Sequence, residues 1–122
     1  MMSRILGLFL WLMVIGLAEV DAQQELTSSS KKAIKLYEEA NNLLRQRRFN
    51  AALIELSNAV EKDPSFTEAY LKMAGIFRTL ADFQNAATYY EKAVQSRPGH
   101  RLNRGAYLYL GDHYFYNVHK IR

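Results

Sequence analysis

The hydrophobic positions between residues 66 and 99 recur with the spacing of two amphipathic helices. Tyr70, Met73, Ala74 and Phe77 lie three or four residues apart, which places them on one face of a helix. The residues with the same spacing in the following segment are Ala86, Ala87, Tyr90, Ala93 and Val94. Because alanine lets helix backbones approach closely, the pattern predicts an antiparallel helix pair with aromatic side chains around the contact.

This pattern occurs twice, at an offset of 34 residues. Small residues fall on small residues and large ones on large ones, and each copy closes with a proline. The matched pairs are Leu36 and Tyr70, Ala40 and Ala74, Leu43 and Phe77, Phe49 and Phe83, Ala52 and Ala86, Leu56 and Tyr90, Ala59 and Ala93, Val60 and Val94, and Pro64 and Pro98. The chain therefore contains an internal structural repeat.

Turn signals separate the predicted helices. Asp63-Pro64 ends one helix, and Ser65 with Glu68 three residues later predicts a capping box that starts the next. The sequence RPGH, residues 97–100, ends the second copy in the same way. Short connections are expected within each pair, near residues 47–49 and 81–83.

The copies resemble tetratricopeptide repeats (TPRs), whose 34-residue pattern runs W-x2-L-G-x2-Y, A-x3-F, A and P. The C-terminal part supplies a third start, whose four matching residues are Tyr107, Leu110, Gly111 and Tyr114. It follows Tyr70 by 37 residues, so three extra residues fall in the loop 99–103. The resemblance implies an all-α fold, a helix-turn-helix solenoid of two full repeats plus the first helix of a third.

The first 22 residues are typical of an export signal. Arg4 precedes an apolar run from Ile5 to Ala18, and Val20-Asp21-Ala22 is a small-x-small cleavage pattern. An uncleaved anchor is the alternative, although the run is short for a membrane span. The chain has no cysteine, which excludes disulfides and argues against a lipid-anchored form. We expect a periplasmic or secreted protein without a membrane span after cleavage.

The expected organisation divides the chain into five parts. They are a signal peptide (1–22), an N-terminal linker (23–31), TPR 1 (32–65), TPR 2 (66–99) and the first helix of an incomplete TPR 3 (100–122). The arrangement of signal and repeats is similar to the start of bacterial OmpA-like envelope proteins that carry TPRs.

The family resemblance implies a concave groove, lined by the first helix of each repeat, that holds peptide segments of partner proteins. The matching groove positions are Tyr37, Asn41, Leu44, Arg45, Leu71, Arg78, Leu108, Asp112, Phe115 and Tyr116. The two-carboxylate clamp of chaperone-binding TPRs is absent, because Tyr37 stands where its first lysine is needed. The other reading of these side chains is that they cover adjacent helices and bind nothing.

Other chemistry finds little support in the sequence. The net charge is +4, but two basic clusters, 45–48 and 97–104, are expected at opposite edges of the array, so no nucleic-acid partner is expected. His113 and His119 lack metal-ligand spacing, and Asp112-His113 are neighbours that face different directions on a helix. We expect no enzyme activity, no metal and no cofactor.

Two functions remain open. The first is a non-catalytic protein-interaction module of an exported protein. The second is a structural spacer or oligomerisation segment of a larger cell-envelope protein. The last helix carries seven large apolar residues around most of its circumference, Tyr107, Leu108, Tyr109, Leu110, Tyr114, Phe115 and Tyr116. It could therefore meet a missing second helix, associate with another chain or bind a partner itself.

Overall fold

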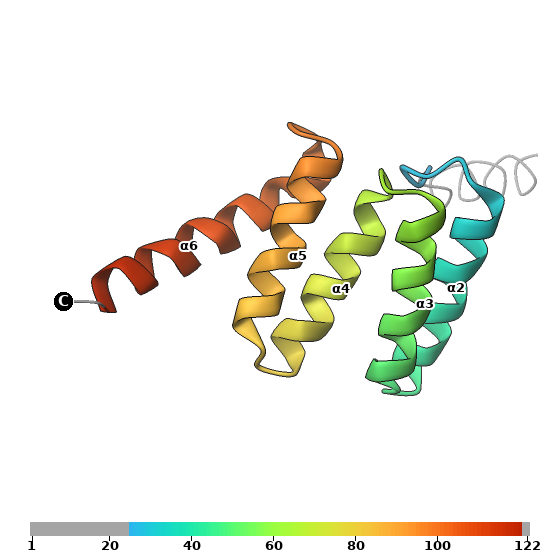
Figure 1. The fold of residues 1–122 in the computed structure, drawn as a ribbon, viewed down its shortest axis with the longest axis horizontal. Coiled ribbons are helices and arrows are strands. Elements are labelled where there is room, and N and C mark those ends of the chain that lie inside the picture. The colour runs from blue at the N-terminus through green and yellow to red at the C-terminus, as the bar shows by residue number, and fades with distance from the viewer. Residues whose placement is uncertain (1–24, 121–122) are drawn as a thin grey trace, which may run out of the picture.

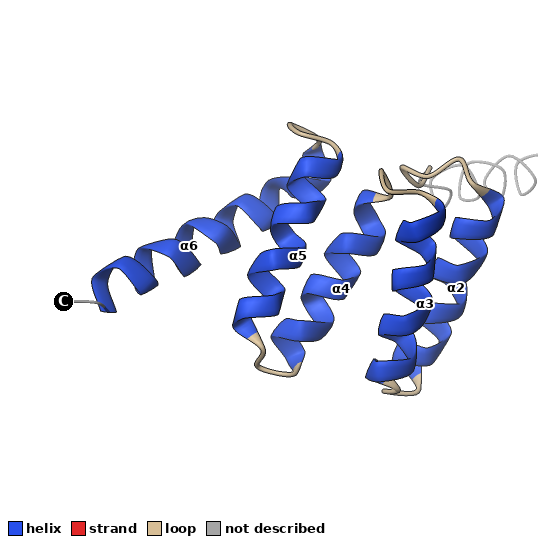
Figure 2. Cartoon of the chain, in the orientation of Figure 1, coloured by secondary structure: helices blue, strands red, loops and turns tan. Residues whose placement is uncertain are grey.

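The computed structural model describes residues 25–120, and every regular element in this range is helical (Figure 2). The predicted signal peptide and its cleavage site lie outside the described residues. The elements are α2 (Lys31–Arg45), α3 (Phe49–Lys62), α4 (Thr67–Thr79), α5 (Phe83–Ser96), the 3-10 helix η1 (Arg101–Asn103) and α6 (Arg104–Lys120). The all-α fold class is confirmed.

The helices form a row of two antiparallel pairs followed by a single helix. In Figure 1, α2 packs beside α3, α4 packs beside α5, and α6 leaves the end of α5 and runs outward. This is the helix-turn-helix solenoid that the repeat predicts, with two complete pairs and the first helix of a third.

The alanines of the repeat lie where the helices approach most closely. Ala52, Ala59, Ala74, Ala86 and Ala93 are all fully buried. The large side chains around them belong to two clusters, one centred on α2, α3 and α4 and the other on α4, α5 and α6. Because Tyr89 contacts both clusters, the core is continuous along the array.

The turns within the two pairs have the same backbone. Arg47 and Ala81, which are 34 residues apart, both have φ of 58°, in the left-handed region that non-glycine residues rarely occupy. The N–H of Arg48 donates to Leu43 O at 2.9 Å, and that of Asp82 donates to Phe77 O at 2.8 Å. Each of these hydrogen bonds closes a turn of six residues and satisfies a free carbonyl at the C-terminus of a helix.

The predicted capping box at Ser65 and Glu68 is wrong. Ser65 turns back instead, and its N–H and hydroxyl donate to Asp63 Oδ1 at 3.0 and 2.7 Å. The Glu68 carboxylate accepts from the N–H of Thr27 at 2.9 Å and from the Thr27 hydroxyl. The free N–H of Thr67 at the start of α4 donates to Thr27 Oγ1 at 3.0 Å. A residue before the first repeat therefore caps the helix that starts the second.

The junctions that precede α4 and α6 differ in chemistry. Phe66, just before α4, is fully buried, with its ring centroid 5.0 Å from that of Tyr37. Asn103, 37 residues later and just before α6, is also fully buried. Its Nδ2 donates to Ala93 O at 3.2 Å and Arg97 O at 2.9 Å. The three extra residues thus place a polar side chain where the preceding junction has an aromatic ring.

Candidate partner-binding groove

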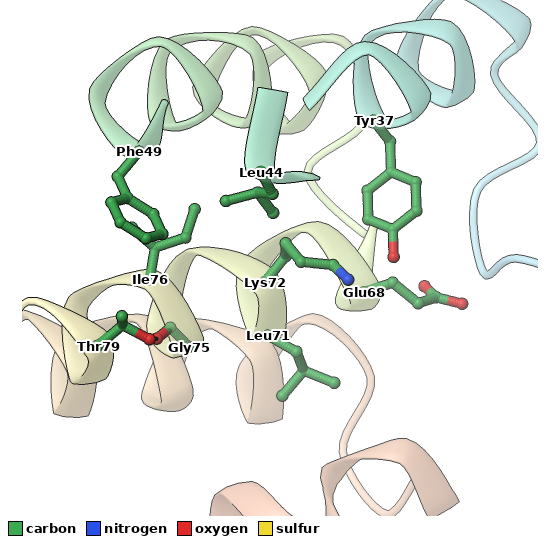
Figure 3. A pocket seen from close by; sticks show the side chains of 9 residues that line it. All are labelled: Tyr37, Leu44, Phe49, Glu68, Leu71, Lys72, Gly75, Ile76 and Thr79. Atoms are coloured by element: carbon green, nitrogen blue, oxygen red, sulfur yellow. Dashed lines mark hydrogen bonds between the residues drawn. The ribbon is translucent and has the colours of Figure 1, made fainter. Parts of the chain in front are cut away.

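A hollow of about 380 Å³ lies between the first helices of the two repeats, α2 and α4 (Figure 3). Its residues come mainly from these helices, with one from the start of α3. They are Tyr37, Leu44, Phe49, Glu68, Leu71, Lys72, Gly75, Ile76 and Thr79. The hollow therefore forms only when the two repeats stack.

One end of this first hollow is amphipathic. The Tyr37 ring projects from α2 toward Lys72 and Glu68 on α4 (Figure 3), and Lys72 Nζ lies 5.7 Å from the ring centroid. Burial raises the pKa of the Tyr37 hydroxyl, while a hydrogen bond with Asn41 opposes the rise. The phenol therefore stays neutral and can donate or accept a hydrogen bond.

The other end is apolar. Leu44 and Phe49 approach Ile76 of α4 in Figure 3, and Ile76 is only 3% exposed. Gly75 forms part of the wall beside Ile76, and a Cβ added at Gly75 would have no atom within 4 Å. A partner side chain of the size of leucine would find apolar contact there and no steric obstacle.

A second hollow lies between α4, α5 and α6. Its lining residues are Arg78, Phe83, Gln84, Tyr109, Asp112, His113, Tyr116, Asn117 and Lys120. Arg78 is the central cation, since its Nη1 donates to the Tyr90 hydroxyl at 3.3 Å and its Cζ lies 5.0 Å from the centroid of the Tyr109 ring. The Tyr90 hydrogen bond raises the pKa of Arg78, so the guanidinium is permanently charged.

The two hollows occupy equivalent places in the repeat. Phe49 lines the first and Phe83 the second, 34 residues apart. At three other pairs of equivalent positions the residue type changes from small or apolar to charged or polar: Leu44 and Arg78, Gly75 and Asp112, and Ile76 and His113. At two more pairs it changes from polar to aromatic: Lys72 and Tyr109, and Thr79 and Tyr116. The same architecture therefore gives two hollows whose charged and apolar side chains lie at different positions of the repeat.

The residues predicted for the groove fall into separate groups. Six of them line the two hollows: Tyr37, Leu44 and Leu71 the first, and Arg78, Asp112 and Tyr116 the second. Leu108 lines a separate depression with Arg101, Arg104 and Tyr107, and Phe115 is 68% exposed. Arg45 bonds its neighbour Asn42. Of the α6 positions assigned by family register, Asp112 and Tyr116 therefore line a hollow shared with α4 and α5, whereas Leu108 and Phe115 do not.

Several lining residues were not among the predicted ones. Phe49 and Phe83 start the second helix of each pair, and Tyr109 and His113 lie on α6. Tyr109 and Tyr90 have ring centroids 4.6 Å apart. The 34-residue offset between Phe49 and Phe83 is the signal for these positions in the sequence, but it does not distinguish a lining role from core packing.

Within residues 25–120, no helix is long and apolar enough to cross a membrane, and no three histidine, cysteine, aspartate or glutamate side chains converge as metal ligands. The basic clusters near residues 45–48 and 97–104 lie at opposite ends of the helices in Figure 1.

Stacked antiparallel helix pairs with a hollow between their first helices define a helical-repeat protein. A family model described as "Tetratricopeptide repeat" matches residues 37–101, more than half of the chain, and the chain belongs to this family. It is also similar to an Arabidopsis thaliana protein described as "DnaJ protein P58IPK homolog", with 31% identity over 74 residues. That match covers 61% of this chain and 15% of the relative's length. Tetratricopeptide repeats generally mediate protein–protein interaction and are typically non-catalytic.

Proposed function

We propose that the chain is a non-catalytic interaction module that holds an extended or helical peptide of a partner protein across both hollows. The observation that carries the proposal is that the hollows lie at equivalent places in the repeat but have different linings. One ligand that spans both hollows would therefore bind in a single orientation. The first accepts an apolar side chain at Leu44, Phe49 and Ile76. The second offers the guanidinium of Arg78, and its lining also contains Asp112 and Lys120.

The expected ligand therefore carries an apolar anchor and a nearby carboxylate or amide. A single well-buried anchor usually dominates the affinity of such a contact. Arg78 is mostly exposed and is already oriented by Tyr90 and Tyr109, so it can bind a carboxylate with little loss of side-chain freedom.

Peptides selected from a random library against the chain would test this proposal. Gly75→Leu fills the space beside Ile76, and we expect at least a tenfold loss of affinity for the selected peptides. Gly105→Leu is the matched control, because an added Cβ at Gly105 also meets no atom within 4 Å but the residue lines neither hollow. Equal affinities of the two variants would place the binding site elsewhere.

We further propose that the protein is exported, to the periplasm or outside the cell, with residues 1–22 as a cleaved signal peptide. The support is the sequence of the first 22 residues alone. Mass spectrometry of the exported protein is expected to find Gln23 as the first residue. If the exported protein still began at residue 1, the proposed cleavage would be contradicted. Deletion of residues 5–18 is expected to abolish export.

A structural role is the second candidate, in which the chain is a spacer or oligomerisation segment of a larger envelope protein similar to the OmpA-like proteins with TPRs. Five large apolar side chains of α6 favour it because they are exposed over about half to two-thirds of their surface. They are Tyr107, Leu108, Tyr114, Phe115 and Val118.

A further inference from the structure

One face of α6 is apolar and uncovered within the described residues. Tyr107 is 48% exposed, Leu108 66%, Tyr114 48% and Phe115 68%. Val118 continues this stripe one turn later. A continuous apolar stripe of this kind on a helix is rarely left to solvent.

The equivalent face of α4 is covered by the second helix of its pair. Ala74 of α4 is fully buried against α5, and the Phe77 ring stacks on Tyr89 with centroids 5.3 Å apart. Gly111 and Tyr114 are the equivalent residues of α6, and both are exposed. The face of α6 that contains Ala106 and Leu110 is already buried against α5. The stripe on α6 therefore has the position of a helix-binding face.

Four residues of the stripe are symmetric about Gly111, and the fifth, Val118, has Arg104 as its counterpart. Leu108 and Tyr114 lie three residues before and after it, and Tyr107 and Phe115 lie four residues before and after it. When two copies of such a helix run antiparallel with a twofold axis at Gly111, each residue before the glycine meets its counterpart after the glycine. Leu108 then packs on Tyr114 of the other copy, and Tyr107 packs on Phe115 of the other copy. This self-complementarity is what an isologous interface requires.

Gly111 also allows the two helices to approach each other. An added Cβ at this position would meet no atom within 4 Å, so the backbone itself is accessible at the centre of the stripe. A glycine at a crossing point brings helix backbones closer than two larger residues would, as Ala74 does in the α4–α5 pair.

We propose that two copies of the chain dimerise through antiparallel pairing of their α6 helices, centred on Gly111. An aromatic side chain offers about 150–250 Å², so the five half-exposed apolar residues offer on the order of 500 Å² per copy. The interface is then on the order of 1,000 Å², at the lower limit for a specific complex. We expect a dissociation constant on the order of micromolar, since interfaces at the low end of the size range are typical of weak, transient complexes.

Cysteine cross-linking tests both the pairing and its register, because the natural chain contains no cysteine. The full chain carries one introduced cysteine per variant and is oxidised at micromolar concentration. Gly111→Cys lies on the twofold axis and is expected to form a covalent dimer rapidly. Ser57→Cys, exposed on α3, is the control and is expected to cross-link at least tenfold more slowly.

The register requires a second pair of variants. Leu108→Cys and Tyr114→Cys are expected to cross-link when the two proteins are mixed and much less when each is oxidised alone. The two copies of residue 108 would be about 9 Å apart along the axis, at 1.5 Å per residue, which exceeds the span of a disulfide. Self-linking at residue 108 as fast as at residue 111 would indicate parallel pairing and overturn the proposal.

Dimerisation without cross-linking supplies an independent measurement. Sedimentation of the full chain is expected to show a concentration-dependent dimer, and Tyr114→Glu with Phe115→Glu is expected to weaken it at least tenfold while the helical circular dichroism is retained. A Gly111→Cys dimer that forms no faster than the Ser57→Cys dimer would overturn the proposal. The stripe would then be covered by something other than a second copy of this chain.

Discussion

The hydroxyl oxygen of Thr27 accepts a hydrogen bond from the backbone N–H of Thr67 at 3.0 Å, although the residues are 40 positions apart. The Arg97 side chain extends the link, since its Nη2 donates to Thr27 O at 2.6 Å. A short segment before α2 therefore connects the start of the second repeat to its end.

Replacement of Thr27 by alanine is expected to lower the free energy of unfolding by about 1 kcal/mol. The change removes an N-cap oxygen from α4 and leaves the N–H of Thr67 without its acceptor. Urea denaturation followed by circular dichroism would measure the effect. Ser29→Ala, at an exposed neighbouring position, is the control and is expected to change stability little.

Replacement of Ala81 by glycine is expected to stabilise the protein by about 0.5–1 kcal/mol. Ala81 has φ of 58°, a conformation that glycine adopts without the steric cost of a Cβ. The same substitution at Ala51, inside α3, is expected to destabilise by a similar amount. Opposite shifts of the thermal midpoint would confirm the expectation, and shifts of the same sign would contradict it.

Acid is expected to weaken the junction between the repeats at Asp63. Hydrogen bonds, first from Ser28 and then from Ser65, lower the pKa of the Asp63 carboxyl below its ordinary value of 3.8. Because the folded state favours the carboxylate, this contribution is present above about pH 4 and is lost as the pH falls through the lowered pKa. Urea midpoints between pH 2 and pH 7 are expected to fall less steeply for Asp63→Asn than for the natural chain. If the urea midpoint of Asp63→Asn depended on pH as that of the natural chain does, the loss of stability in acid would come from other titratable groups.

Replacement of Arg78 by methionine is expected to loosen α6 while leaving α2 and α3 unchanged. Arg78 connects three helices, because it lies on α4, bonds Tyr90 of α5 and contacts the ring of Tyr109 on α6. Hydrogen exchange of residues 104–120 is expected to accelerate several-fold. Residues 31–62 serve as the internal control, and acceleration there as well would indicate general destabilisation instead.

The repeat was predictable because its signal is periodic and local. The alanines at 34-residue intervals and the prolines after each pair indicated the helix pairs, and their burial agrees with that interpretation. The cap at Thr27 could not be predicted, since Ser65 and Glu68 have the spacing of a local capping box and only the fold brings Thr27 to them. Similarly, the family pattern gave no information on the outward course of α6, which depends on the loop 99–103.

The groove was predictable in part for the same reason. Positions such as Tyr37 and Leu71 follow from the register of the first helices, and the structure places both in the first hollow. The contrast between Leu44 and Arg78, or Ile76 and His113, is visible in the sequence, but it becomes meaningful only once the two hollows are known to be equivalent.

The exchange of Phe66 for Asn103 at equivalent junctions has a mechanical consequence. Phe66 resists separation of its neighbours through apolar contact over a large area, which weakens gradually as the helices move apart. Asn103 instead depends on two directional hydrogen bonds at 2.9 and 3.2 Å, which fail over a displacement of about 1 Å. If the array were pulled along its length, the two hydrogen bonds of Asn103 would therefore break abruptly, whereas the contact of Phe66 would weaken gradually.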